Sequence, residues 1–221
     1  MPAVVIYGAG DNGREVGETL LAAQDNGGGW ELVGFLDDGP DKQGARVLGL
    51  PVLGTAEWIG DHRQVQVAMG IGHPRWRRSA AARVEALGGR WATVVHPCAV
   101  LSPSATIGEG CVIFAGVVLS SNSRLGRLVQ ANFNAVIHHD TEVGDLAALM
   151  ANVALGGNVR VGEGTFVGMG TQVRQGVSVG EWTLVGCGAS VVRDLPAYCV
   201  ATGVPARPVR SYSTPQEMPA I

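Results

Sequence analysis

Residues 137–172 read IHHDTE, VGDLAA, LMANVA, LGGNVR, VGEGTF and VGMGTQ, six consecutive units of six residues each. The same division runs without a gap from residue 95 to residue 196 and gives 17 units. The first position is Val, Ile or Leu in every unit but one, where it is Ala131, and the fifth is small or β-branched in every unit but the last, where it is Leu195. A period of six that never slips predicts a parallel β-helix built from short strands and tight corners.

The period also predicts which distant residues meet. Three units make one triangular coil, so residues 18 apart in the sequence are expected to stack. A β-sandwich fits less well, because its strand spacing drifts at turns over about 8 to 12 residues. The period alone leaves the handedness open, and the general preference for right-handed parallel crossovers favours a right-handed helix.

The first 93 residues show a different pattern, in which strands and helices alternate. Strands are predicted over residues 4–7, 31–36 and 65–69, and helices over residues 14–24 and 75–87. Such alternation is typical of an α/β unit. The predicted parts are a Rossmann-like nucleotide-binding domain over residues 1–93, the β-helix over residues 94–198, and a C-terminal loop and tail over residues 199–221.

A glycine-rich turn follows the first predicted strand. Gly8, Gly10 and Gly13 form the pattern G-x-G-x-x-G between a strand and a helix, and Asp37 and Asp38 end the second strand. In this context the glycines allow a tight turn and let a phosphate approach the helix N-terminus. A dinucleotide would need two mononucleotide-binding halves, and only one is present. We therefore expect a nucleotide-linked sugar rather than NAD, and a nicotinamide-dependent dehydrogenase is the remoter alternative.

Two adjacent histidines stand inside the repeat. His138 and His139 belong to the unit IHHDTE and are followed by Asp140, while His73, in the loop GIGHPRW, is a candidate for the wall of the nucleotide crevice. An amine or hydroxyl that attacks a thioester must lose a proton, and an imidazole with a pKa of about 6.5 can accept it near neutral pH. A carboxylate on the other ring nitrogen fixes the tautomer. The trio is therefore a candidate general base with its orienting acid.

Neither a metal centre nor a cysteine nucleophile is predicted. His96 lies 43 residues before His139 and 42 before His138, and neither separation is a multiple of 18, so the repeat offers no stacked set of zinc ligands. The four cysteines contain no C-x-x-C pair and fit buried or packing thiols in a reducing compartment.

Composition excludes several classes of partner. The formal net charge of −3 and the charged fraction of 16% offer no basic stripe for a nucleic acid. The N-terminus runs straight into a strand without a signal-peptide pattern, and no uninterrupted apolar run approaches the length of a membrane span. We therefore expect a cytoplasmic protein with neither a nucleic-acid nor a membrane partner.

The order of motifs along the chain resembles a known family. These motifs are GAGDNG, GFLDDG, VVHPCAVLSPSATIGEG, HHD and GVPARPVR, and they span about residues 3 to 209. They are similar to the bacterial sugar acetyltransferases of the sialic acid O-acetyltransferase type, which include N-acetyltransferases acting on nucleotide-linked 4-amino sugars. The resemblance implies a left-handed β-helix, acetyl-CoA as the co-substrate, a nucleotide-linked sugar as the acceptor, and a homotrimer with active sites between subunits.

The same resemblance implies roles for individual residues. His139 becomes the general base, Asp140 its orienting partner, and Gly157, one coil later, supplies a backbone N–H to the thioester carbonyl. The remaining assignments are acetyl-CoA contacts at Met169, Cys187 and Arg207, with Arg210 as a further candidate for the CoA phosphates; nucleotide contacts at Gly8, Gly10, Asn12, Gly13, Asp37 and Asp38; and an acceptor site at Asn134 and His138.

Two departures from the family pattern concern the acceptor. Ala148 stands where the amino-sugar enzymes usually carry a second histidine, and Asn132-Phe133-Asn134 replaces the usual Asn-Thr-Gly before the catalytic stretch. Acetylation of a sugar amino group is the predicted activity. O-acetylation of a sugar hydroxyl is the alternative, and a non-catalytic nucleotide-binding scaffold is more remote.

Overall fold

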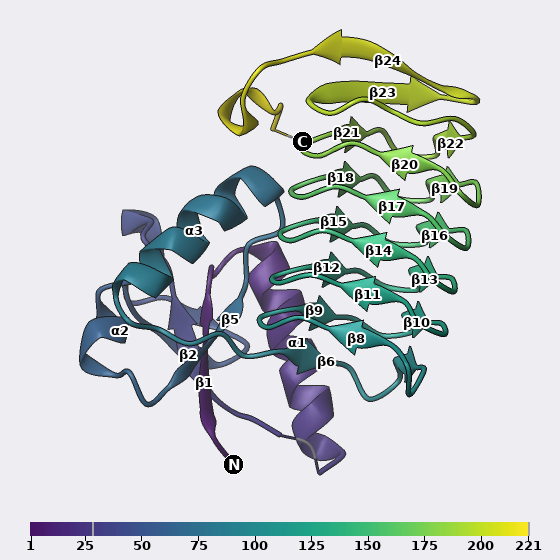
Figure 1. The fold of residues 1–221 in the computed structure, drawn as a ribbon. Coiled ribbons are helices and arrows are strands. Elements are labelled where there is room, and N and C mark those ends of the chain that lie inside the picture. The colour runs from purple at the N-terminus through teal and green to yellow at the C-terminus, as the bar shows by residue number, and fades with distance from the viewer. Residues whose placement is uncertain (28, 221) are drawn as a thin grey trace.

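Two bodies lie side by side in the computed structural model, which describes residues 1–27 and 29–220 (Figure 1). The N-terminal residues form a sheet with helices, and the rest of the chain forms a stack of short strands. Among the described residues, none of the helices combines the length and the apolar character that a membrane span requires.

The N-terminal body is built on a five-stranded sheet in the order β3-β4-β2-β1-β5. Its elements are β1 (Ala3–Tyr7), α1 (Asp11–Asp25), β2 (Glu31–Leu36), the 3-10 helix η1 (Pro40–Lys42), β3 (Arg46–Val47), β4 (Leu50–Gly54), α2 (Trp58–Asp61), β5 (Gln66–Met69) and α3 (Pro74–Ala86). Strand β1 pairs in parallel with β2 and β5, the central strand β2 also pairs in parallel with β4, and only the β3–β4 pair is antiparallel. This arrangement corresponds to one of the two halves of a Rossmann fold, each of which forms one mononucleotide-binding unit.

The strands and helices predicted for this body are present, with β3, β4, α2 and η1 in addition. Helix α1 begins at Asp11 rather than at residue 14, because Gly10 is its N-cap and Gly13 lies within its first turn. Strand β4 reads LPVLG, and its proline and glycine are residues that strands usually avoid. Periodicity alone therefore did not reveal it.

Seventeen strands of two residues follow. From β7 on, each joins the last residue of one six-residue unit to the first residue of the next, and β6 joins Val94 to the first residue of the first unit. They are β6 (Val94–Val95), β7 (Val100–Leu101), β8 (Thr106–Ile107), β9 (Val112–Ile113), β10 (Val118–Leu119), β11 (Arg124–Leu125), β12 (Gln130–Ala131), β13 (Val136–Ile137), β14 (Glu142–Val143), β15 (Ala148–Leu149), β16 (Ala154–Leu155), β17 (Arg160–Val161), β18 (Phe166–Val167), β19 (Gln172–Val173), β20 (Ser178–Val179), β21 (Leu184–Val185) and β22 (Ser190–Val191).

These strands form three parallel sheets, one on each side of a triangular column. Val118 pairs with Val136, and Gln130 with Ala148, so the partners are 18 residues apart as the repeat predicts. The register changes only at the last coil, where Leu184 pairs with Val200.

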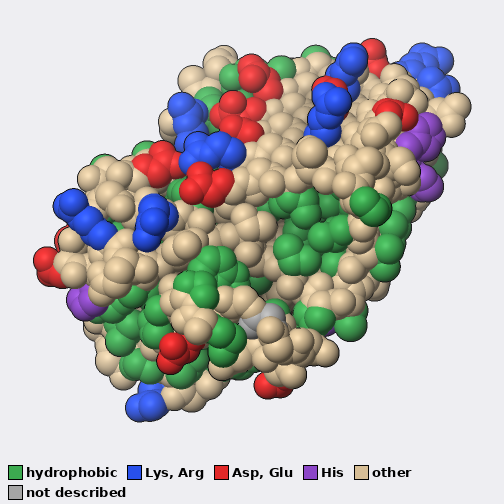
Figure 2. Space-filling view, turned by 60° about the horizontal axis from the view of Figure 1, so that its bottom comes forward, with side chains coloured by type: hydrophobic (Ala, Val, Ile, Leu, Met, Phe, Trp, Pro, Cys, Tyr) green, Lys and Arg blue, Asp and Glu red, His purple; other side chains and the backbone are tan. Residues whose placement is uncertain are grey.

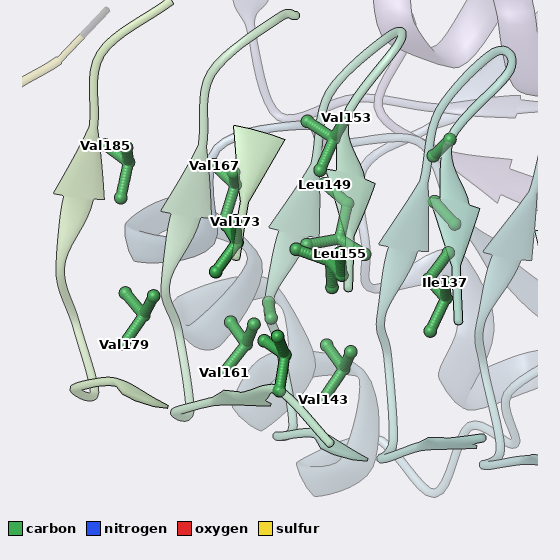
Figure 3. Packing of buried hydrophobic residues seen from close by; sticks show 14 of the residues in the cluster. Ile137, Val143, Leu149, Val153, Leu155, Val161, Val167, Val173, Val179 and Val185 are labelled. Atoms are coloured by element: carbon green, nitrogen blue, oxygen red, sulfur yellow. The ribbon is translucent and has the colours of Figure 1, made fainter. Parts of the chain in front are cut away.

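The interior of the column is filled by the first position of each unit. From Ile113 to Val191 this side chain is buried in every unit. Figure 3 shows Ile137, Val143, Leu149, Leu155, Val161, Val167, Val173, Val179 and Val185 pointing into the column from its three sides. Each such side chain contributes about 1.5–3 kcal/mol by leaving water, and together they stabilise the stack.

The corners impose a second constraint, at the fourth position of each unit. From Gly110 to Gly188 every fourth position has φ between 51° and 73°, the left-handed region. Glycine, asparagine and aspartate tolerate this conformation best. On one of the three corners large residues also occur, namely Leu128, Leu146 and Trp182, and these side chains pack in the cluster that joins the column to the N-terminal body.

The N-terminal body covers only one side of the column. The outward residues of the covered sheet, such as Gln130, Ala148 and Phe166, are buried. The sheet from β7 to β22 is uncovered, and its outward residues are largely apolar: Val100, Val118, Val136 and Ala154. Figure 2 shows hydrophobic side chains in a patch on the half of the surface that the column occupies and in another on the half that the N-terminal body occupies. The third sheet presents charged residues instead, with Glu142 between Arg124 and Arg160.

Residues 199–221 were predicted to be a loop and tail, and this was wrong for their first part. β23 (Cys199–Gly203) and β24 (Ala206–Ser211) form an antiparallel hairpin that extends the covered sheet. The hairpin caps the last coil, whose backbone groups would otherwise lack partners. After it, the 3-10 helix η2 (Pro215–Glu217) returns toward α3, where the buried Met218 joins the same hydrophobic cluster.

The interior column predicts a large cost for losing one side chain. Leu149 is 0% exposed, so Leu149→Ala should lower the free energy of unfolding by about 2–5 kcal/mol through lost burial and a cavity. Val209, on β24, is 63% exposed, and Val209→Ala should change the free energy of unfolding by less than about 0.5 kcal/mol. Denaturant titration of both variants measures the difference, and equal effects would contradict the inward placement of Leu149.

Candidate functional site

His139 and Asp140 form a hydrogen-bonded pair at the corner between β13 and β14. His139 Nδ1 lies 2.9 Å from Asp140 Oδ2. The two side chains are 55% and 46% exposed, so the pair stands at the surface of the column rather than within it. An ionised carboxylate can only accept, so Nδ1 carries the proton that joins the two, and Nε2 of a neutral ring is left with a free lone pair.

Asp140 is held in place by two residues of the preceding coil. Asn122 Nδ2 donates to Asp140 Oδ1 at 3.2 Å, and the backbone N–H of Asp140 donates to Ser121 O at 3.0 Å. The hydrogen bonds from His139 and Asn122 lower the pKa of Asp140, so its carboxylate is ionised at neutral pH. Its φ of 56° gives this position a second reason to be aspartate, since it is also a left-handed corner.

Gly157 lies directly beneath the imidazole. A Cβ atom at this position would stand 2.5 Å from both Cε1 and Nε2 of His139, so only glycine leaves room for the ring. Among the backbone hydrogen bonds of the described residues, none is donated by the N–H of Gly157. The predicted stacking of residue 157 on residue 139 is therefore present, and it places an unused donor close to Nε2.

A surface pocket of about 620 Å³ opens beside this group. It is lined by His138, His139, Gly156, Gly157, Arg174 and Gln175. Arg174 and Gln175 were missed from the sequence, although they lie one coil beyond Gly156 and Gly157 and the 18-residue repeat points to both. Arg174 brings a permanent positive charge to this lining, and a carbonyl, carboxylate or phosphate of a ligand is its natural partner.

The other predicted donor residues lie elsewhere in the chain. Met169 follows β18 and Cys187 follows β21; both are exposed and stack on each other, with Gly188 N–H donating to Met169 O at 2.8 Å. This corner is not that of His139, because β18 and β21 belong to a different sheet from β13. Asn134, a left-handed residue, lies on the same corner as Met169, and Arg207 lies exposed on β24. Within one chain these residues do not meet His139.

The predicted nucleotide turn is shaped by contacts within the chain. Gly8 has φ of 112°, and a side chain on Gly13 would collide with the Gly8 carbonyl, whereas Gly10 faces open space. Asp37 accepts hydrogen bonds from Ala9 N–H at 2.7 Å and Gly39 N–H at 2.9 Å, and so holds the turn against the end of β2. Of the three glycines in this turn, Gly10 is therefore the one that a bound molecule can approach.

The carboxylate of Asp38 is engaged in hydrogen bonds within the protein. Its Oδ2 accepts from the Tyr7 hydroxyl and from Arg83 Nη1 at 2.8 Å, and its Oδ1 accepts from Ala56 N–H at 3.1 Å. Burial and the nearby Asp38 carboxylate raise the pKa of Tyr7. With both oxygens engaged, Asp38 fastens three segments of the N-terminal body, and a ligand contact to it would have to compete with these bonds.

Asn12 borders a second pocket, of about 510 Å³, between the two bodies. Its walls come from the starts of α1 and α3 and from the covered sheet, and they include His73, Trp76, Met150 and Phe166. His73 is nearly buried; its Nε2 lies 2.8 Å from Pro219 O, and its Nδ1 accepts from Arg75 N–H at 3.3 Å. Burial lowers the pKa of His73, so it stays neutral and ties the C-terminal tail to this pocket.

No group of three or more His, Cys, Asp or Glu side chains is arranged to hold a metal ion in the part of the chain that the structure describes.

Two comparisons of the sequence with known proteins each give a match. Residues 3–84 match the family described as the PglD N-terminal domain. A GDP-perosamine N-acetyltransferase of Escherichia coli O157:H7 is 30% identical over 143 residues, which is 63% of this chain and 63% of that protein. The aligned segment thus spans less than two thirds of that relative.

Solved structures match over nearly the whole chain. The acetyltransferase domain of PglB from Neisseria gonorrhoeae FA1090 is 34% identical, with a TM-score of 0.85 over 95% of this chain and 100% of that chain. PerB from Caulobacter crescentus, in complex with CoA and GDP-perosamine, is 36% identical, with a TM-score of 0.84 over 93% and 96%. These matches confirm the predicted fold class, a Rossmann-like domain followed by a left-handed parallel β-helix.

The contact between His139 and Gly157 can be tested directly. In Gly157→Ala the new methyl group would lie 2.5 Å from the ring, so the imidazole must leave its place, and its exposed position lets it do so without unfolding the column. We expect shifted His139 ring signals in ¹H–¹⁵N NMR spectra and little change in melting temperature. In Gly60→Ala the added methyl meets only Leu87, at 4.0 Å, and should leave those signals unchanged. Unshifted His139 signals in Gly157→Ala would contradict the placement.

Proposed function

Because this chain belongs to the family of bacterial sugar acetyltransferases that includes the perosamine N-acetyltransferases and the PglB acetyltransferase domain, we propose that it transfers an acetyl group from acetyl-CoA to the amino group of a nucleotide-linked 4-amino-4,6-dideoxy sugar. The observation that carries the proposal is the His139–Asp140 pair standing over Gly157. It provides a base, a group that orients it, and a backbone donor beside it.

In the proposed mechanism His139 acts as the general base. The amine of the acceptor attacks the thioester carbonyl carbon, and a C–N bond forms while Nε2 of His139 removes a proton from the nitrogen. The C–S bond then breaks, and the imidazolium returns the proton to the departing thiolate. Asp140 stabilises the imidazolium through its bond to Nδ1–H. In this mechanism the N–H of Gly157, which makes no backbone hydrogen bond among the described residues, donates to the carbonyl oxygen as that oxygen gains negative charge.

We propose that the donor site is completed by a neighbouring subunit in a homotrimer. Met169 and Cys187, the predicted contacts of the pantetheine arm, lie on another corner of the column than His139. The uncovered apolar sheet between those two corners, with Val118 and Val136 on its outer face, supports packing against another copy. Such packing would bring the corner of one chain to the His139 pocket of the next.

The nucleotide part of the acceptor is assigned to the pocket bordered by Asn12. The glycine turn and the N-terminus of α1 lie beside it, and the free N–H groups of a first helical turn favour phosphate oxygens. The sugar would extend from this pocket toward a catalytic corner of the trimer. This assignment separates the acceptor nucleotide from the donor pocket of about 620 Å³ at His139.

A thiol-release assay with acetyl-CoA tests the activity and the acceptor together. We expect CoA to form with one or more UDP-, GDP- or dTDP-linked 4-amino sugars and no CoA above background without an acceptor. Sialic acid and the corresponding 4-hydroxy sugars serve as O-acetylation controls. Turnover with hydroxyl acceptors alone would overturn N-acetylation, and CoA formation with none of them would overturn the proposed function.

Substituting His139 tests the assignment of the base. His139→Ala should lower kcat by about 10² to 10⁴, the range for loss of a general base, while the acceptor KM changes by only a few-fold. His138→Ala should cost much less, because the pair of His139 with Asp140 remains. Asp140→Asn should be intermediate, since asparagine keeps the left-handed corner and loses only the charge. Steady-state kinetics at neutral pH measure all three.

The pH dependence of His139→Ala provides the control. An amine acceptor deprotonates in solution as the pH rises, so the rate of the variant should recover partly at high pH. A hydroxyl acceptor would show no recovery in that range. Full activity of His139→Ala at neutral pH, or a larger loss in His138→Ala, would contradict the assignment.

A further inference from the structure

A fully buried arginine lies where α3 meets the β-helix. Arg77 is 0% exposed and has no carboxylate among its hydrogen-bond partners in the described residues. Its Nη1 donates to Ile71 O at 3.0 Å and to Gln130 Oε1 at 2.9 Å, and its Nη2 donates to Leu128 O. Burial lowers its pKa to about 10, so it is a cation at neutral pH. A buried cation is costly, and neutral oxygens from the loop after β5, from β12 and from the corner before β12 are what hold it.

Arg77 sets the direction of a chain of hydrogen bonds. A guanidinium can only donate, so the Gln130 amide must turn its oxygen to Arg77 and its nitrogen away. That nitrogen donates to Asn12 Oδ1 at 2.8 Å. Asn12 must then turn its own nitrogen away from Gln130. The orientation of both amides therefore follows from the charge of Arg77 and is not a free choice between flipped forms.

The chain of hydrogen bonds ends at the candidate nucleotide pocket. Asn12 is the second residue of α1 and lies between Gly10 and Gly13 of the glycine turn, and its side chain borders the pocket of about 510 Å³. Its Nδ2 is buried and has no hydrogen-bond partner in the described part of the chain. A buried donor without an acceptor costs free energy, and a ligand atom in the adjoining pocket, reached by a small movement of the amide, would remove that cost.

We propose that Arg77 and Gln130 are positioning residues for the acceptor: they turn the Asn12 N–H₂ group toward the bound nucleotide, where it donates to an oxygen of the diphosphate. The inference rests on the proposed function for the identity of the ligand. A diphosphate offers only acceptors, and these suit the Asn12 N–H₂ group and the free N–H groups at the N-terminus of α1; the carboxylates of Asp11 and Glu15, which also border this pocket, cannot donate to them. The β-helix, through Gln130, thus determines which atom the nucleotide domain presents to its ligand.

Gln130→Glu tests the direction of the hydrogen-bond chain. The introduced carboxylate still accepts from Arg77 and pairs with its charge, but it cannot donate to Asn12. Asn12 must then turn its nitrogen to that carboxylate and its oxygen to the pocket. Isothermal titration should show that the tightest binder among GDP, UDP and dTDP binds about 10- to 100-fold more weakly, the range for a lost bond to a charged group. The melting temperature and the Kd of CoA should stay near their wild-type values.

A double-mutant cycle separates positioning from the added negative charge. If Gln130 acts through Asn12, Gln130→Glu should weaken nucleotide binding in the wild type but hardly at all in Asn12→Ala. Equal losses in both backgrounds, or none in either, would overturn the inference. Gln64→Glu, which adds the same charge at an exposed site of the N-terminal body, should leave nucleotide binding unchanged.

Two further outcomes are informative. If Gln130→Glu fails to fold, Gln130→Met has a similar shape, removes the donor to Asn12, and enters the same cycle with the same expected non-additivity. If the wild-type protein binds none of the three nucleoside diphosphates, the acceptor named under the proposed function is overturned. Tight wild-type binding with an additive cycle overturns only the positioning role.

Discussion

Hydrogen bonds between strands 18 residues apart are the constraint on which the rest of the molecule depends. Because each coil lies in register on the one before, every position of the six-residue unit becomes a column of stacked residues. The first position fills the interior, the fourth turns the corner, and the second and third lie between them. His139 and Gly157 meet because they occupy the same column in successive coils. The catalytic geometry proposed above is thus a property of the repeat.

The constraint also explains how much of the molecule the sequence could predict. The strands, their register, the interior residues and the stacking of Gly157 under His139 all follow from a six-residue count. The count further separates Met169 from His139, since the 30 residues between them are not a multiple of 18, and the structure places them on different corners. The periodicity of one chain does not predict which column of another copy would face the column of His139.

Side-chain hydrogen bonds across long sequence distances were the part that the sequence did not reveal. Asp38 has the position of a nucleotide ligand, yet its oxygens are taken by Tyr7, Arg83 and Ala56. Asn12 was singled out, but its orientation depends on Gln130, 118 residues later. No local pattern links such residues, because they meet only after the two bodies pack together.

The large left-handed residues on one corner have a consequence for protein engineering. Leu128, Leu146 and Trp182 adopt a backbone conformation that bulky side chains disfavour, and the ring of Trp182 lies where Gly164 has no side chain. Their burial against the helix that carries Ala81 and Val84 offsets that cost. A chimera that joins this column to a foreign nucleotide domain must therefore carry a matching helix surface, or replace these corner residues with glycine or asparagine. The need for matching surfaces, rather than the linker, therefore limits which nucleotide domains can be joined to this column.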